Sequence, residues 1–330
     1  MNALILAPFT VEALETLSSR VGVIYQSWTE SRRLLEPEEL LDYIQNREVQ
    51  IVVIEADFIF EEVIKLARNL RLIGVCRGSV SNVDIEAATR YGIPVINAPG
   101  RNNIAVAELT IGLVFSLVRR IPEAHQLVKS GGWVDPVGPY ISLRGTELTG
   151  TTAGILGFGA IGKEVARRML ALDIEELVYD PYVSAADIEK IGARPATLED
   201  LVKYSDILSI HCPLTEETRN MLDARRLANL KRGVYLINTA GWEIVEETAL
   251  LEALKDGRIA GAAFDVFETH PLSRNNPLLE LPNVILTPHI GGATDNTISR
   301  YSRMITGDIL RFLDGIKPVH LVNPAVWKNG

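Results

Sequence analysis

The chain has 330 residues, of which 47% are hydrophobic and 23% charged, a composition typical of a globular protein with room for two domains. Its formal net charge is −9 and it has no dense basic stripe, so neither nucleic acid nor an anionic membrane is expected as a partner. The longest apolar helical run, residues 111–118, is too short to cross a bilayer, and the apolar N-terminus lacks the features of a signal peptide. We therefore expect a cytoplasmic protein.

The two cysteines, Cys76 and Cys212, both lie in apolar, strand-like segments and do not form a C-x-x-C pair. This spacing supports neither a disulfide nor a zinc site. We expect two buried thiols and no bound metal.

The first hundred residues alternate short apolar runs with helical patterns. The runs predict parallel strands buried on both faces, at residues 3–6, 21–25, 50–54, 72–76 and 94–96. Helices are expected at 37–44, which opens with a proline, and at 82–90, with Asn82 as its cap. After the breaker cluster 97–100, residues 104–128 predict one long apolar helix with a kink at Pro122, and we place the first domain crossing there.

A glycine motif in the middle of the chain is the strongest local signal. Gly157, Gly159 and Gly162 follow an apolar run and open directly into a helical segment. In a strand–turn–helix unit of this kind, the glycines permit the turn, the approach of a pyrophosphate and the packing of the helix on the strand. Asp180 ends the next apolar run, where a carboxylate accepts hydrogen bonds from ribose hydroxyls and repels a 2′-phosphate. The motif predicts NAD rather than NADP.

A second series of strands and helices continues from this motif. Strands are expected at 207–211, 234–237, 261–266 and 283–286, with a helix at 246–255. The last helix, 296–313, is expected to return to the first domain. The sequence thus predicts an α/β protein of two doubly wound parallel-sheet domains with a cleft between them, residues 1–98 plus 296–330 and residues 99–295.

Six motifs in order give the chain a family resemblance. They lie at 92–99 with 106–109, at 157–162, at 211–218, at 236–240, at 261–267 and at 287–294. Together they resemble the D-isomer-specific 2-hydroxyacid dehydrogenases, the family of phosphoglycerate, glycerate/glyoxylate and D-lactate dehydrogenases. The resemblance implies a flavodoxin-like substrate domain, a Rossmann NAD-binding domain, a small-molecule substrate and a homodimer formed through the apolar helix 104–118.

The resemblance also assigns site residues. The implied cofactor contacts are Gly157, Gly159, Ala160, Ile161, Gly162, Asp180, Cys212, Thr218, Thr239, Ala240, Gly241, Asp265, His289 and Gly291. Within this set Asp180 is expected at the adenine ribose and Asp265 at the carboxamide. The implied substrate loop begins at Arg77, Gly78 and Ser79, whose backbone N–H groups would hold a carboxylate.

The resemblance implies catalysis by three residues, a histidine, a glutamate and an arginine. His289 matches the histidine, which exchanges the hydroxyl proton. Gly241 stands at the position of the arginine that holds the carboxylate, and His270 stands at that of the glutamate beside the histidine. Arg77 is a candidate for the missing guanidinium and Glu268 for the missing carboxylate. The neighbouring Trp242 is expected either to stack on the substrate or to pack in the core.

We therefore expect an NAD-dependent oxidoreductase that transfers hydride between nicotinamide and a small 2-hydroxy or 2-keto acid, with His289 as general acid and base and with His270 and Arg77 in supporting catalytic positions. Two alternatives remain open. One is an NAD(H)-sensing interaction protein with impaired catalysis, which fits an intact cofactor motif with two altered catalytic positions. The other is a dehydrogenase whose substrate lacks a carboxylate.

Overall fold

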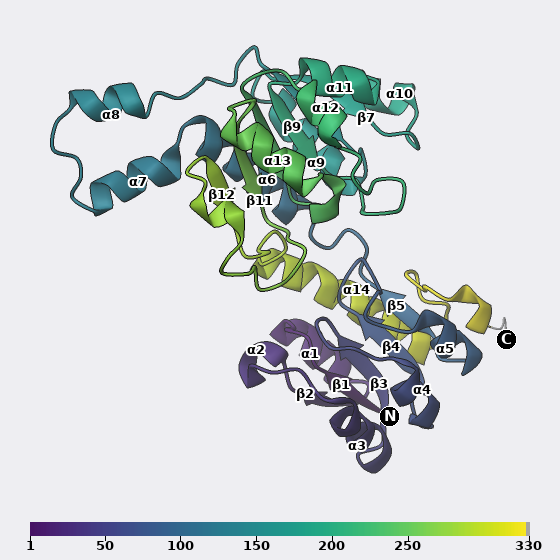
Figure 1. Cartoon of the computed structure of the whole chain (residues 1–330). Helices are drawn as coiled ribbons and strands as arrows, with labels where there is room; N and C mark the ends of the chain where they lie inside the picture. The colour runs from purple at the N-terminus through teal and green to yellow at the C-terminus, as the bar shows by residue number, and fades with distance from the viewer. Residues whose placement is uncertain (328–330) are drawn as a thin grey trace. The chain divides into compact units, whose positions relative to one another are not determined.

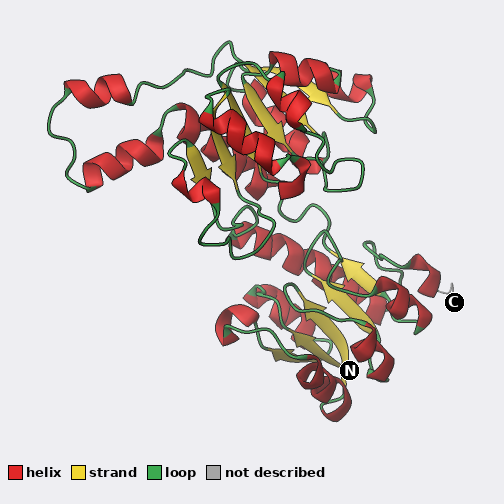
Figure 2. Ribbon diagram, viewed as in Figure 1, coloured by secondary structure: helices red, strands yellow, loops and turns green. Residues whose placement is uncertain are grey.

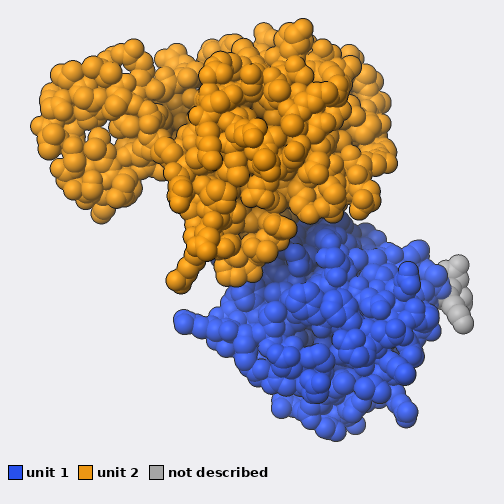
Figure 3. All heavy atoms as spheres, viewed as in Figure 1, with its two compact units in different colours: residues 1–101, 294–330 blue, residues 102–293 orange. Residues whose placement is uncertain are grey.

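The computed structural model describes residues 1–327 and divides the chain into two compact units (Figure 3). Unit 1 comprises residues 1–101 together with the chain from Thr294 onward, and unit 2 comprises residues 102–293. Each unit is built on its own parallel sheet with helices on both faces (Figure 2). The predicted α/β class with two parallel-sheet domains is confirmed.

Unit 1 has a five-stranded sheet in the order β2-β1-β3-β4-β5, which is the flavodoxin-like order. The strands are β1 (Asn2–Ile5), β2 (Gly22–Tyr25), β3 (Val49–Ile54), β4 (Leu72–Val75) and β5 (Val95–Asn97). The helices are α1 (Val11–Ser18), α2 (Trp28–Ser31), α3 (Pro37–Asn46), α4 (Glu61–Leu66), α5 (Ile85–Arg90) and α14 (Asp295–Leu313), with a 3₁₀ turn at Pro324–Val326. All five predicted strands are present.

The helix α14 completes the core of unit 1. Its apolar face buries Tyr301, Ile305 and Ile309 against the sheet, and the Tyr301 hydroxyl donates to the carbonyl oxygen of Pro8 over 2.8 Å. The chain after α14 then pairs with the edge strand β5, where the N–H of Val322 donates to the carbonyl of Val95. Burial of an amphipathic stripe therefore explains why this late helix belongs to the first sheet.

The start of α5 differs from the prediction. The helix begins at Ile85, and its cap is Asp84, whose Oδ1 accepts from the N–H of Ala87 over 2.8 Å. The predicted cap, Asn82, donates its side-chain amide to the carbonyl oxygen of Asp57 instead. Asn82 is wrong as a cap because its buried amide is used to hold a neighbouring loop.

Unit 2 has a seven-stranded parallel sheet in the order β12-β11-β10-β9-β6-β7-β8 (Figure 1). The strands are β6 (Thr152–Leu156), β7 (Glu175–Tyr179), β8 (Arg194–Pro195), β9 (Ile207–Ile210), β10 (Val234–Asn238), β11 (Ile259–Phe264) and β12 (Val284–Leu286). The helices are α6 (Asn103–Val118), α7 (Ile121–Lys129), α8 (Val137–Ser142), α9 (Ala160–Leu170), α10 (Ala185–Glu189), α11 (Leu198–Tyr204), α12 (Ala224–Ala228) and α13 (Glu247–Lys255), with 3₁₀ turns at Trp242–Ile244 and Pro277–Glu280.

The strand order of unit 2 reverses between β6 and β9. The loops after two neighbouring strands run in opposite directions at such a point and leave a crevice at the carboxyl ends of the strands. Doubly wound sheets bind their ligands in this crevice. The two faces of the sheet carry separate cores, one formed with α11 to α13 and the other with α6 and α9. Because the strands are parallel, every loop that follows a strand emerges at the same edge of the sheet.

The segment after β5 contains two helices where the sequence predicted one kinked helix. α6 ends at Val118, Arg120 takes a left-handed conformation with φ of 51°, and α7 begins at Ile121. Pro122 lies in the first turn of α7, where its missing N–H costs no hydrogen bond. The predicted kinked helix is therefore two separate helices, α6 and α7.

α6 is a core helix of unit 2. It packs on α9, β10 and β11 and buries Val106, Thr110, Leu113 and Leu117 there, so much of its apolar surface is covered within the unit. A group of exposed apolar residues lies in the next segment, residues 121–142, which we call the arm. In Figure 1 the arm projects from the sheet of unit 2, and Val134 and Tyr140 are 86% and 77% exposed. No helix within residues 1–327 is long and apolar enough to span a membrane.

Glu176 on β7 is a carboxylate buried in the sheet of unit 2. It is 2% exposed, and neither of its carboxyl oxygens has a hydrogen-bond partner within residues 1–327. Because side chains alternate along a strand, Glu176 shares a face with the buried Val178. Burial raises the pKa of Glu176 to about 8.

This raised pKa predicts that stability falls with rising pH. Between the unperturbed pKa of 4.5 and the folded-state pKa of about 8, the unfolded chain ionises Glu176 while the folded chain keeps it protonated. Between pH 5 and pH 8 the free energy of unfolding of Glu176→Gln should therefore rise relative to that of the natural chain. The rise should amount to a few kcal/mol, at about 1.4 kcal/mol per pKa unit. Urea unfolding at pH 5, 7 and 9 measures the difference.

The exposed neighbour Glu175 provides the control, since Glu175→Gln should change the free energy of unfolding by under about 0.5 kcal/mol at each pH. If the free energies of unfolding of Glu176→Gln and of the natural chain changed with pH in the same way, the raised pKa of Glu176 would be contradicted.

Candidate active site

The glycine turn joins β6 to α9 at the edge where the strand order reverses. Gly157 has φ of 94°, and a Cβ there would lie 2.4 Å from the backbone nitrogen of Cys212. A Cβ at Gly162 would lie 2.1 Å from the carbonyl oxygen of Gly157, so the third glycine lets the helix meet the turn. A Cβ at Gly159 would meet nothing within 4 Å. The middle glycine thus faces open space at the N-terminus of α9, which fits a pyrophosphate.

A pocket of about 440 Å³ lies beside this turn. It is formed by the end of β6 and by the loops after β7 and β9, the strands on either side of β6. Its lining residues are Leu156, Gly157, Tyr179, Asp180, Pro181, Tyr182, Cys212, Pro213, Thr215, Glu216, Glu217, Thr218 and Met221. We call it the adenosine pocket, because it adjoins the glycine turn and contains the carboxylate predicted for the ribose.

Asp180 is held in place by two backbone donors. Its Oδ2 accepts from the N–H of Phe158 over 2.7 Å, and its Oδ1 accepts from the N–H of Tyr182 over 2.9 Å. A carboxylate oxygen accepts two hydrogen bonds, so each keeps one position for a ribose hydroxyl. The carboxylate is fixed before any ligand arrives.

Cys212 and Thr218, predicted on the adenosine side, both line this pocket. Burial raises the pKa of the Cys212 thiol to about 11, so the thiol is neutral at physiological pH. The Thr218 hydroxyl donates to the carbonyl oxygen of Pro213 over 2.7 Å and shapes the loop. Next to them, burial lowers the pKa of His211 to about 3, and its Nε2 lies 2.8 Å from the Ser209 hydroxyl, so His211 is a neutral packing residue.

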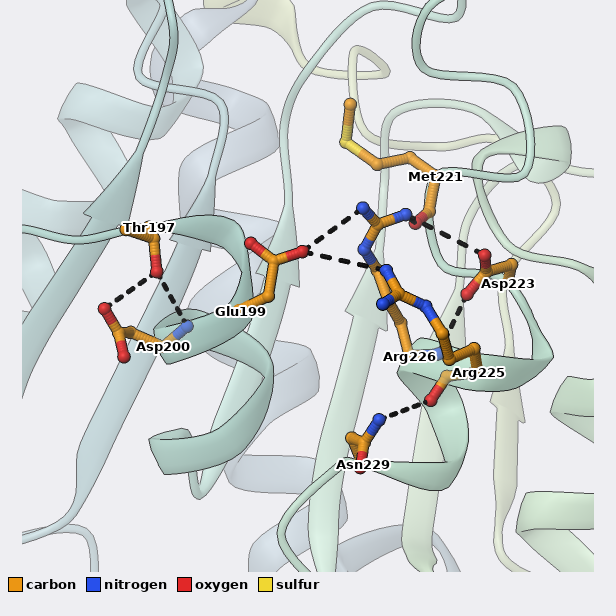
Figure 4. Close-up of polar contacts among 8 residues, drawn as sticks. All are labelled: Thr197, Glu199, Asp200, Met221, Asp223, Arg225, Arg226 and Asn229. Carbon is orange, nitrogen blue, oxygen red and sulfur yellow. Dashed lines mark hydrogen bonds and ion pairs between the residues drawn. The ribbon is translucent and has the colours of Figure 1, made fainter.

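A polar network fixes the segment that carries Met221, a lining residue of the adenosine pocket (Figure 4). Arg226 on α12 donates to the carbonyl oxygen of Met221 over 2.9 Å. Its guanidinium also lies 3.3 Å from Glu199 on α11 and 3.9 Å from Asp223. The network ties α11 and α12 to the wall of the pocket.

The turn after β10 carries Thr239, Ala240 and Gly241. The buried Asn238 organises it, since its Oδ1 accepts from the N–H groups of Ala240 and Gly241, and its side-chain amide donates to the carbonyl oxygen of Gly241. A Cβ at Gly241 would lie 3.1 Å from the Cβ of Leu214 and 3.3 Å from the Cδ1 of Ile244. Apolar side chains therefore close the space beside Gly241.

Trp242 packs in the core. It is 7% exposed and meets Phe264 edge-on, with ring centroids 5.2 Å apart, and Phe267 at 6.3 Å. Of the two roles left open by the sequence, the structure supports packing.

Asp265, directly after β11, anchors the loop after β12. Its Oδ1 accepts from the Thr287 hydroxyl over 2.6 Å and from the N–H of Ile290 over 2.8 Å, and its Oδ2 accepts from the N–H of Gly291 over 2.7 Å. Asp265 is 2% exposed, so these bonds are shielded from water. They hold His289 between two fixed points in a left-handed conformation with φ of 56°. The predicted contact of Asp265 with the carboxamide stays a prediction.

His289 and His270 lie side by side on the surface of unit 2. The Nδ1 of His289 is 3.1 Å from the Nε2 of His270, and the ring centroids are 5.0 Å apart. The ring of His270 also lies 6.2 Å from that of Phe267. One imidazole must donate and the other accept in this bond, so the contact requires at least one neutral ring.

The predicted substrate residues Arg77, Gly78 and Ser79 come after β4 and belong to unit 1, whereas all the predicted cofactor residues belong to unit 2. The carbonyl oxygens of Arg77 and Gly78 accept from the N–H of Ala98 and the side chain of Asn97. These bonds fix the start of the loop. Glu268 is exposed.

The sequence reasoning missed polar groups on both units. Glu55, directly after β3, lies 2.7 Å from Arg101, and their side chains are 16% and 12% exposed. Tyr182, Glu217 and Met221 line the adenosine pocket without having been predicted. Their position shortly after predicted strands was the available signal. Within residues 1–327, no three His, Cys, Asp or Glu side chains are grouped so as to hold a metal.

Comparison with known proteins agrees with this geometry. The family profile described as the D-isomer specific 2-hydroxyacid dehydrogenase NAD-binding domain matches residues 111–291. The chain is 40% identical over 310 residues to a glyoxylate reductase of Thermofilum pendens, which covers 93% of this chain and 89% of that protein. It is 38% identical to a D-3-phosphoglycerate dehydrogenase of Archaeoglobus fulgidus over 98% of this chain, but spans only 59% of that longer protein.

Solved structures give the same result. The TT0316 protein of Thermus thermophilus superposes with a TM-score of 0.86 at 33% identity, over 98% of this chain and all of that chain. The apo D-lactate dehydrogenase of Escherichia coli superposes with a TM-score of 0.82 at 26% identity, over 97% of this chain and 99% of that one. Unit 2 is thus an NAD-binding domain, and the chain belongs to the D-isomer specific 2-hydroxyacid dehydrogenase family.

Proposed function

We propose that the protein is an NAD-dependent oxidoreductase acting on a small 2-hydroxy or 2-keto acid, with His289 as general acid and base. The observation that carries this proposal is the 3.1 Å contact of His289 with His270, on a loop fixed by Asp265. This loop comes after a strand of the sheet that also presents the glycine turn. The relatives named as glyoxylate reductase and D-3-phosphoglycerate dehydrogenase support the substrate class.

NAD, when bound, supplies or accepts the hydride. The chain's own task is to move the proton that accompanies it. Because the Nδ1 of His289 is bonded to His270, we assign the proton exchange with the substrate oxygen to Nε2. The three bonds to Asp265 hold the backbone on either side of His289, and the contact with His270 orients its ring, so the entropy cost of positioning that nitrogen is lowered.

We assign His270 the role of partner to His289. By the resemblance it replaces a glutamate, and a neutral imidazole stabilises the protonated form of its neighbour less than a carboxylate does. The bond also couples the two rings, because a proton on one nitrogen decides which tautomer the other ring adopts. His270 therefore orients His289 without adding negative charge.

The substrate carboxylate needs a contact other than Gly241, where Leu214 and Ile244 occupy the adjoining space. We retain Arg77, Gly78 and Ser79 as the proposed carboxylate contacts. The apolar surroundings of Gly241 also favour the second candidate, a dehydrogenase for a substrate that lacks a carboxylate.

Replacing His289 tests the proposed general acid and base. The natural protein should oxidise NADH with at least one of a panel of 2-keto acids and neutral carbonyl compounds, and His289→Ala should lower kcat by about 10²- to 10⁴-fold, because the proton donor is lost. The dissociation constant for NADH, measured by fluorescence titration, should change little, since the adenosine pocket is intact.

The outcomes separate the three functions. Turnover with keto acids that disappears in His289→Ala supports the proposal, and turnover with neutral carbonyl compounds alone supports the second candidate. NADH binding without turnover on any compound would contradict both and leave an NAD(H)-sensing protein.

Replacing His270 tests its proposed role as partner to His289. His270→Glu places a carboxylate beside His289, which favours the protonated ring, so the pH at which the reduction rate falls to half should move upward. His270→Gln keeps a hydrogen-bonding side chain without a charge and serves as the matched control, with an unmoved profile expected. Initial rates of NADH oxidation from pH 5 to pH 9 test this, and identical profiles for all three proteins would exclude a role for His270.

We also propose that the protein is a cytoplasmic homodimer. Both cysteines are free and buried, as in a reducing compartment. The arm exposes a cluster of large apolar side chains, Trp133, Val134, Val137, Tyr140 and Ile141. Apolar patches of this kind mark interfaces, and a twofold dimer is the commonest way to cover one. The arm, rather than α6, is therefore the proposed contact.

The arm gives a prediction on assembly. The natural chain should elute with twice the 36.4 kDa chain mass, and Val134→Asp with Tyr140→Asp should convert it to the monomer, because buried charges disfavour the interface. Val11→Asp, on an exposed position of α1 in unit 1, is the control and should leave the mass unchanged. Size-exclusion chromatography with light scattering measures these masses, and a monomeric natural chain would refute the proposal.

A further inference from the structure

The adenosine pocket has a feature that the family resemblance did not predict. The Tyr182 hydroxyl donates to the Oε2 of Glu217 over 2.6 Å, and the backbone N–H of the same tyrosine donates to Asp180. Tyr182 is in the loop after β7 and Glu217 in the loop after β9, the strands that flank β6. Since adjacent strands lie about 5 Å apart, this side chain spans a pocket whose two rims are roughly 10 Å apart.

The contact lies at the solvent side of the pocket, because Tyr182 is 81% exposed. The hydrogen bond to Glu217 raises the pKa of the Tyr182 phenol, so the hydroxyl stays protonated and remains a donor. Glu217 would otherwise be a flexible surface side chain. Tyr182 instead holds its carboxylate at the rim opposite Asp180.

The charge of the pocket is one-sided. Asp180, Glu216 and Glu217 line it, and none of its lining residues is lysine, arginine or histidine. A 2′-phosphate would bring further negative charge into a space about one Debye length wide, between the carboxylate of Asp180 on one rim and that of Glu217 on the other. A ribose hydroxyl, being neutral, meets no such repulsion.

We propose that Glu217, held by Tyr182, is a second specificity-determining carboxylate that excludes 2′-phosphorylated cofactors. Asp180 selects NAD by accepting hydrogen bonds from ribose hydroxyls, and Glu217 acts from the opposite rim by repelling a phosphate. Its effect is electrostatic, so it depends on where the carboxylate is held and weakens with salt. Tyr182 is the positioning residue.

Cofactor binding tests this without turnover. The dissociation constants of NADH and NADPH are measured by fluorescence titration of the full chain. Glu217→Gln should tighten NADPH binding about three- to tenfold, as expected for removing one unit charge near the pocket, and leave NADH binding within about twofold. Tyr182→Phe should change the NADPH/NADH ratio in the same direction by less, because it frees the carboxylate without removing it.

Glu216→Gln is the matched control, since it removes the same charge from the adjacent lining residue that is not bonded to Tyr182. Its NADPH/NADH ratio should change by less than that of Glu217→Gln, because the Glu216 carboxylate is not held at the rim by Tyr182. Added salt should strengthen NADPH binding relative to NADH in the natural chain more than in Glu217→Gln.

An unchanged ratio in Glu217→Gln would overturn the proposal. An equal effect of Glu216→Gln would also overturn it, because net charge rather than the held carboxylate would then be responsible. Neither result bears on whether the protein is a dehydrogenase, since binding is measured and no substrate is present.

Discussion

The parallel arrangement of the strands in unit 2 is the constraint on which its site depends. Parallel strands need a helical crossover each, so every strand points the same way and every loop after a strand emerges at one edge. The glycine turn, Asp180, Asn238, Asp265 and His289 are far apart in sequence and meet at that edge for this reason alone. The candidate site residues follow the carboxyl ends of the strands, while the buried bodies of the strands form the core.

Backbone hydrogen bonds to buried side chains then give this edge its precision. Asp265 and Asn238 are 2% and 0% exposed, and each accepts bonds from the N–H groups of a turn that would otherwise be mobile. Asp180 does the same for the turn that leads to the pocket. In all three cases a polar side chain at a strand end accepts from the backbone of a loop, which lies in the same segment for Asn238 and in a segment remote in sequence for Asp180 and Asp265. These bonds fix the loop before a ligand binds.

The two proposed properties of the site depend on pairs of side chains that the fold brings together from different loops. His270 and His289 come from the loops after β11 and β12, and Tyr182 and Glu217 from those after β7 and β9. In the first pair an imidazole orients the proposed acid and base, and in the second a hydroxyl holds a carboxylate in place. The proposed proton transfer and the proposed choice of cofactor therefore both depend on where the fold places a side chain.

Every strand except the short β8, the glycine turn and the family could be predicted from the sequence, because buried parallel strands are continuous apolar runs and a phosphate-binding turn needs glycine at fixed positions. The end of α6 and the cap of α5 could not be predicted from the sequence. The left-handed conformation of Arg120 and the bond of the Asn82 side chain to Asp57 depend on the rest of the fold. The packing of Trp242 against Phe264, the contact of His270 with His289 and the bond of Tyr182 to Glu217 arise from tertiary contacts. These contacts join loops remote in sequence, and no local pattern records which side chains will meet.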